Sequence, residues 1–142
     1  YFEDQNLAGS AGWMRVQAQE ELAHAMKFFD WINERRGRVA LAGIDKPDFE
    51  WGSPLEAFEA SFKHEQYITG RINDLVALAI EEKDFASRNM LNWFVDEQVE
   101  EESSVDAVLQ QLRMIGDSKH GLYMIDRELG ARQAGAAAEE EA

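Results

Sequence analysis

The stretch that decides the fold is FASRNMLNWFVDEQVEEESSVDAVLQQLRMI, residues 85–115. Its apolar residues recur at alternating steps of three and four, which places them on one face of a helix that packs in a bundle. Gly116 follows and can end the helix. Two polar residues, Gln98 and Glu101, interrupt the middle of this stripe. The stripe consists of Leu91, Phe94, Gln98, Glu101, Val105, Val108, Leu112 and Ile115.

The same spacing predicts two more long helices. One covers about residues 10–36, where Ser10 can cap the start and Gly37 can stop the end. The other starts at Ser53-Pro54-Leu55-Glu56, a strong start signal, and runs to about residue 82. A shorter helix is expected over residues 118–129. We therefore predict an all-α fold with one domain over residues 1–133, followed by a flexible Ala/Glu-rich tail over residues 134–142.

The two connections between the long helices differ in kind. The joint at Lys83-Asp84 is tight, so the helices on either side should be antiparallel neighbours. Residues 37–52 form a long link that contains Pro47 and three glycines. When extended, such a link reaches about 50 Å, and a helix of some 27 residues is about 40 Å long. The link can therefore cross a whole helical bundle and start the next helix parallel to the previous one.

Each long helix carries a carboxylate inside its apolar stripe. These carboxylates are Glu21 in the first helix, Glu65 in the second and Glu101 in the third. A carboxylate in a dry core costs several kcal/mol unless it is paired or bound to metal. The tight joint sets Glu65 and Glu101 at nearly the same height, and Glu21 matches Glu65 if those two helices run parallel. We therefore expect all three carboxylates to converge.

The histidine at position 24 completes this set. His24 lies one turn after Glu21, on the same helix face. Carboxylates together with imidazole suit iron, manganese or zinc. The alternative is a hydrogen-bonded polar layer without metal. Three further glutamates, Glu20, Glu97 and Glu100, lie one step around each helix, where a solvated surface charge is the simpler interpretation.

Composition excludes several classes of function. The chain has 142 residues, 45% of them hydrophobic and 30% charged, and a formal net charge of −14. Such an acidic surface repels nucleic acid and anionic lipid. The chain has no cysteine, which excludes disulfides, thiolate catalysis and Cys-type metal sites. Its longest apolar run, residues 75–80, is too short to span a membrane, and we expect a cytoplasmic location.

Four motifs resemble one known family, the non-haem ferritins of bacteria and archaea. They are QEELAHAMKFF (19–29), FKHEQYITGRI (62–72), NWFVDEQVEEE (92–102) and GLYMIDREL (121–129). The resemblance implies a ferritin-like four-helix bundle with a long crossover and a short C-terminal helix. It implies iron storage with ferroxidase activity, in which Fe(II) is oxidised to Fe(III) by O2 or peroxide. It also implies a homo-oligomeric cage of 24 subunits.

The resemblance also implies roles for individual residues. Glu21 would bridge two irons, and His24 would complete the first iron site. Glu65 and Glu101 would hold the second iron, with Gln98 nearby to orient a ligand or substrate. The third iron site of prokaryotic ferritins would use Glu101 and the three surface glutamates named above, Glu20, Glu97 and Glu100.

Two positions differ from the pattern of the haem-binding bacterioferritins. Gln98-x-x-Glu101 stands where a bacterioferritin would carry a second Glu-x-x-His, and Leu22 stands where a haem-binding Met is usual. The resemblance implies a di-iron centre, and the two departures argue for the non-haem branch and against bound haem. A rubrerythrin-like peroxidase is the other di-iron alternative, but the chain lacks its cysteine module and the second Glu-x-x-His.

The start of the chain departs from the family pattern. Tyr1-Phe2-Glu3-Asp4 resembles the end of the family's first helix, so we expect that helix, with its iron ligand, to be nearly absent. Either an N-terminal segment precedes these residues or another chain supplies the helix. Otherwise the protein is a catalytically impaired structural cage subunit or a passive iron-binding protein.

Overall fold

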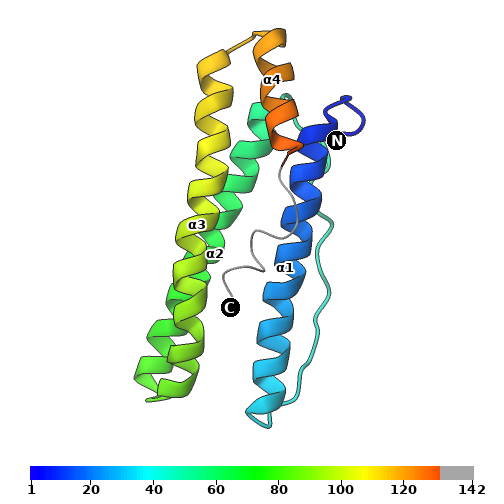
Figure 1. The fold of residues 1–142 in the computed structure, drawn as a ribbon. Coiled ribbons are helices and arrows are strands. Elements are labelled where there is room, and N and C mark those ends of the chain that lie inside the picture. The colour runs from blue at the N-terminus through cyan, green and yellow to red at the C-terminus, as the bar shows by residue number, and fades with distance from the viewer. Residues whose placement is uncertain (132–142) are drawn as a thin grey trace. The chain divides into compact units, whose positions relative to one another are not determined.

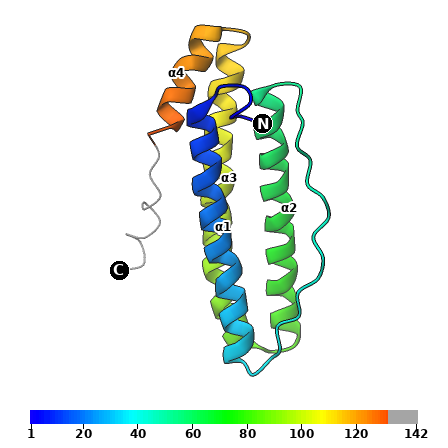
Figure 2. The ribbon, with the colours of Figure 1, turned by 90° about the vertical axis from the view of Figure 1, so that its right-hand side faces the viewer.

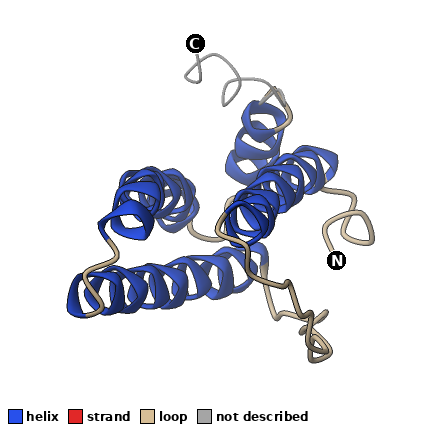
Figure 3. Cartoon of the chain, turned by 90° about the horizontal axis from the view of Figure 1, so that it is seen from below, coloured by secondary structure: helices blue, strands red, loops and turns tan. Residues whose placement is uncertain are grey.

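The protein is all-α, as predicted. The computed structural model describes residues 1–131, and that range contains no strand (Figure 3). Residues 35–53 join α1 to α2 without a helix or a strand. The predicted tail over residues 134–142 lies outside the described residues. The helices are α1 (Ala8–Glu34), α2 (Pro54–Glu81), α3 (Phe85–Ile115) and α4 (Lys119–Leu129).

The expectation of a chain that is nearly without its first helix is not supported. Residues 1–7 form turns, and the helix that follows them, α1, has 27 residues. Together with the short α4, the described chain contains four helices. The sequence predicts the same four: three long helices and a shorter one near residues 118–129.

Local sequence sets some of the helix ends, and tertiary contacts set others. Ser53 caps α2 as predicted, because its Oγ accepts a hydrogen bond from the Glu56 backbone N–H at 3.2 Å. Ser10 was wrongly predicted as a cap, because it lies inside α1, whose N-cap position is Leu7. At the other end of α1 the left-handed residue is Arg36, with φ of 61°, and the Gly37 N–H closes the turn onto the Ile32 carbonyl at 2.8 Å.

Residues 51–118 form one compact unit, built from α2 and α3. The tight joint at Lys83-Asp84 makes these helices antiparallel neighbours, as predicted, and side-chain contacts confirm the direction. Arg113 late in α3 pairs with Glu59 early in α2 at 3.0 Å, whereas Gln98 pairs with Glu65 further along α2. The apolar residues of the predicted stripes are buried between them, including Phe58, Ile72, Leu91, Phe94, Val105 and Leu112.

The other compact unit contains α1 with residues 35–50 and, from the C-terminal part of the chain, α4. The short α4 lies against the N-terminal end of α1 (Figures 1 and 2). The Asp126 carboxylate of α4 accepts hydrogen bonds from the backbone N–H groups of Gly9 at 3.1 Å and Ser10 at 2.7 Å, and from the Ser10 hydroxyl at 2.8 Å. A side chain from a distant helix therefore satisfies the open N–H groups of α1.

Gly9 is required for this contact. A Cβ atom at position 9 would lie 1.6 Å from the backbone carbonyl oxygen of Asp126, so only glycine lets the two helices approach this closely. No described helix is long and apolar enough to cross a membrane. The single domain over residues 1–133 stays a prediction.

We predict that Asp126→Ala lowers the free energy of unfolding by about 1–3 kcal/mol, because three donors at the start of α1 lose their acceptor. Chemical denaturation followed by circular dichroism measures the change. Asp117→Ala, which removes an exposed carboxylate just before α4, is the matched control. Equal stability of the two variants would contradict the role given to Asp126.

Candidate metal centre

A layer of three polar side chains interrupts the apolar interface of α2 and α3. These residues, Glu65 of α2 with Gln98 and Glu101 of α3, are each only 4% exposed to solvent and are here called the polar layer. Apart from Thr69, one turn after Glu65 on α2, the neighbouring positions of the two stripes are apolar. The structure therefore buries the polar residues that the sequence places within the stripes of α2 and α3.

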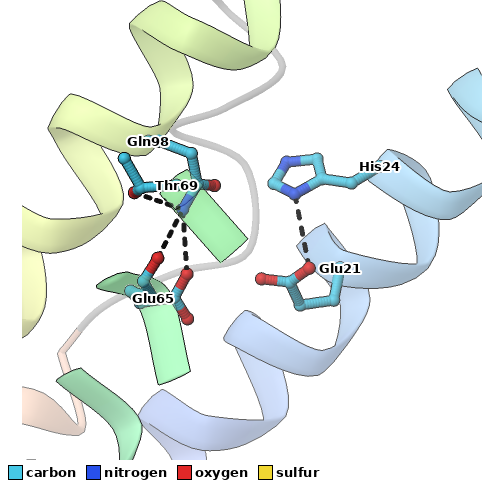
Figure 4. A network of polar contacts seen from close by, with 5 residues as sticks. All are labelled: Glu21, His24, Glu65, Thr69 and Gln98. Carbon is cyan, nitrogen blue, oxygen red and sulfur yellow. Dashed lines mark hydrogen bonds and ion pairs between the residues drawn. The ribbon is translucent and has the colours of Figure 1, made fainter. Parts of the chain in front are cut away.

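Gln98 joins the two helices at this level (Figure 4). Its side-chain nitrogen lies 3.3 Å from the Glu65 backbone oxygen, 3.3 Å from Glu65 Oε2 and 3.3 Å from Thr69 Oγ1. The amide is neutral, so it can satisfy a lone pair of the Glu65 carboxylate without cancelling its charge. The two carboxylates of this layer offer oxygen ligands that suit a cation.

Two residues beside the polar layer were not predicted from the sequence as part of the site. The Thr69 hydroxyl donates to Glu102 Oε1 at 2.6 Å, which extends the network from Gln98 towards the surface. A groove of about 340 Å³ opens at this position, lined by Thr69, Ile72, Asn73, Val95, Gln98, Val99 and Glu102. Thr69 could have been noticed, because it lies four residues after Glu65 on the same face of α2.

The second group of predicted ligands lies on α1. His24 Nδ1 and Glu21 Oε2 are 3.6 Å apart, and the histidine side chain is largely buried, whereas Glu21 is half exposed (Figure 4). This distance is too long for a hydrogen bond. It is close to the separation of roughly 3.0–3.5 Å expected for two ligand atoms that bind the same cation at about 2.1 Å each. The spacing of these atoms therefore suits a shared metal ion.

The remaining three glutamates are more accessible than the residues of the polar layer. Glu20 and Glu97 are partly buried, and Glu100 is exposed. Glu97 and Glu100 are three residues apart and share one face of α3. Their placement fits a surface charge as well as a metal ligand, so the third iron site stays a prediction.

Both groups of side chains offer ligand atoms of the kinds that bind transition metals. Carboxylate oxygens and imidazole nitrogen bind divalent iron, manganese and zinc, whereas a site for calcium would consist of oxygen alone. Carboxylates also stabilise the higher oxidation state of a metal, because their negative charge compensates the additional positive charge. An oxidisable metal held by such groups can give up an electron.

Comparison with known proteins identifies the family. The family model of the ferritin-like domain matches residues 1–115. A bacterial non-haem ferritin of Bacteroides fragilis is 40% identical over 132 residues, which are 93% of this chain and 82% of the relative. A probable bacterial non-haem ferritin-like protein of Haemophilus influenzae is 38% identical over 128 residues, which are 90% of this chain and 78% of the relative.

A solved structure shows the same fold. It is the open pore ferritin of the hyperthermophilic archaeon Archaeoglobus fulgidus, with a TM-score of 0.93 and 52% sequence identity over 94% of this chain and 82% of that chain. This likeness confirms the predicted helical bundle with a long connection and a short C-terminal helix. The chain belongs to the ferritin family, in its prokaryotic non-haem branch.

Proposed function

We propose that this protein stores iron by the chemistry of its family, using the ligands on α1 and on the α2–α3 pair together as a ferroxidase centre. The substrate is Fe(II), and two ferrous ions give up one electron each to O2 or peroxide. The Fe(III) product is then stored inside an oligomeric cage. The burial of Glu65 and Glu101 is the observation that carries this proposal.

Burial of these carboxylates has a cost in free energy. A buried carboxylate that keeps its charge costs several kcal/mol, and a hydrogen bond from a neutral amide recovers only part of this cost. A bound dication removes the penalty, because its charge is compensated by the carboxylates that surround it. The burial of these two carboxylates therefore supports a role for the polar layer in binding a cation.

In the proposed centre each residue has its own task. Glu21 bridges the two irons, and His24 binds the first iron through its ring nitrogen. Glu65 and Glu101 bind the second iron, while Gln98 orients a ligand or the oxidant. Within the α2–α3 pair, antiparallel packing holds Glu65, Gln98 and Glu101 in one layer, so little rearrangement of these three is needed when iron binds.

The cage is the second part of the proposal. The connection after α1 carries large apolar side chains with almost complete exposure in the single chain, among them Leu41 at 88% and Ile44 at 96%. Exposed apolar residues gathered in this way mark a surface for protein contacts. We propose that this connection packs against other copies of the chain in a 24-subunit cage. The absence of haem and the cytoplasmic location stay predictions.

The first prediction of this proposal concerns the ligands. Glu65→Ala, Glu101→Ala or His24→Ala should slow ferrous oxidation in air by about tenfold or more, because each removes a group that binds iron. The absorbance of the ferric product gives the initial rate. Glu81→Ala, which removes an exposed carboxylate from the end of α2, should keep the rate of the unaltered protein.

Two outcomes would contradict this assignment. If all three ligand variants oxidise iron as fast as the unaltered protein, the centre lies elsewhere. If the unaltered protein binds Fe(II) without consuming oxygen faster than buffer alone, the passive iron-binding alternative is correct.

The second prediction concerns the buried charge of Glu101. Glu101→Gln keeps the shape of the side chain and removes its charge, so the variant should bind a dication less tightly than the unaltered protein. Adding Co(II) should raise the melting temperature of the unaltered protein more than that of the variant. Calorimetry measures both. A variant that is less stable without metal yet equally stabilised by Co(II) would show that Glu101 serves the fold alone.

The third prediction concerns the cage. Ile44→Asp should shift the protein from 24 copies to smaller species, because it places a charge in an apolar contact. Native mass spectrometry measures the number of copies. Ala42→Asp adds the same charge to the same exposed connection without removing a large apolar side chain, and should assemble more completely. Full assembly of the Ile44 variant would place the contact elsewhere.

A further inference from the structure

We propose that Thr69 is a positioning residue, which holds the Gln98 amide in the orientation that the iron centre needs. The inference rests on the proposed ferroxidase function and deepens it. In this view the Thr69 hydroxyl keeps the amide nitrogen of Gln98 directed at Glu65 and Thr69. The amide oxygen, which can serve as a metal ligand or accept a hydrogen bond, is thereby turned away from them.

The direction of the hydrogen bonds carries the argument. The Thr69 hydroxyl has one proton, and it lies 2.6 Å from Glu102 Oε1, the length of a strong hydrogen bond to a carboxylate. A carboxylate only accepts, so the hydroxyl proton belongs to this bond. The Thr69 oxygen can then only accept from Gln98, and the Gln98 atom that faces it, 3.3 Å away, must be the nitrogen.

The other two acceptors of the Gln98 amide are less dependable. The Glu65 carboxylate is a proposed iron ligand, so bound iron draws its lone pairs away from the amide. The Glu65 backbone oxygen lies inside α2 and already accepts the helical hydrogen bond of its own chain. Of these three acceptors, Thr69 alone is neither a proposed iron ligand nor part of the backbone hydrogen bonding of α2.

The orientation matters because the two ends of an amide differ chemically. The oxygen of Gln98 has lone pairs for a metal or a hydrogen-bond donor, whereas the NH2 group only donates hydrogen bonds. A reversed amide would turn its NH2 group towards the metal and its oxygen towards Thr69 and the two acceptors of Glu65. The chain Glu102–Thr69–Gln98 thus decides which atom of Gln98 the centre can use.

Thr69→Val tests this role, because valine has nearly the same shape and lacks the hydroxyl. The open groove beside position 69 accommodates the extra methyl group. We expect the initial rate of Fe(II) oxidation to fall about tenfold, the typical effect of removing a group that orients a metal ligand. We also expect an altered visible spectrum of bound Co(II), which stands in for Fe(II). Thr69→Ser keeps the hydroxyl and should restore both to within about twofold of the unaltered protein.

Glu102→Ala gives a second, independent variant. Without its acceptor the Thr69 proton is free to turn towards Gln98, so the amide can reverse. The Co(II) spectrum should change in the same way as in the valine variant. Ser104→Ala and Glu81→Ala are the matched controls, since they remove an exposed hydroxyl and an exposed carboxylate from the same pair of helices.

The outcomes separate this inference from the proposed function. If Glu65→Ala loses activity while Thr69→Val keeps both the rate and the Co(II) spectrum, the inference about Thr69 is wrong and the proposed function stands. If Glu65→Ala keeps the full rate, the iron centre itself is wrongly placed. Should Thr69→Val fail to fold by circular dichroism, an unchanged Co(II) spectrum in Glu102→Ala would overturn the role of Thr69.

Discussion

Burial of negative charge between two antiparallel helices is the constraint on which the rest of this structure depends. Glu65 and Glu101 are almost inaccessible to solvent in an interface that is mostly apolar above and below them. Desolvation of a carboxylate is among the largest penalties that a fold can carry. Under the proposed function, a bound cation offsets this cost. The burial that is proposed to serve metal binding thus costs folding stability at this level of the interface.

Apolar packing elsewhere between α2 and α3 offsets the cost of these buried carboxylates. A short joint of two residues, Lys83 and Asp84, sets the register, and apolar side chains fill the interface on both sides of the polar layer. The cooperative packing of long helices keeps the penalty local, since helical stability comes mostly from the buried apolar face. The Gln98 amide then ties the two helices together at the level where apolar packing is interrupted.

The direction of the hydrogen bonds also fixes the orientation of side chains at the polar layer. Glu102 fixes the proton of Thr69, and Thr69 in turn fixes the nitrogen of Gln98. Such relays act through geometry and not through charge, so they can tune a metal ligand without entering the coordination shell. At the start of α1, one carboxylate likewise fixes several groups, because Asp126 accepts hydrogen bonds from three donors.

The sequence by itself determined the helices, their order and the polar character of the layer, because apolar spacing and cap residues are local signals. It placed α3 correctly at Phe85–Ile115 and predicted the cap at Ser53. Only the tertiary structure decided that Asp126 satisfies the start of α1 and that Thr69 and Glu102 join Gln98. Those contacts link residues that are up to 117 positions apart. Their partners are chosen by packing in three dimensions. The spacing along α2 places Thr69 on the same face as Glu65, but it does not identify the residues of α3 that Thr69 contacts.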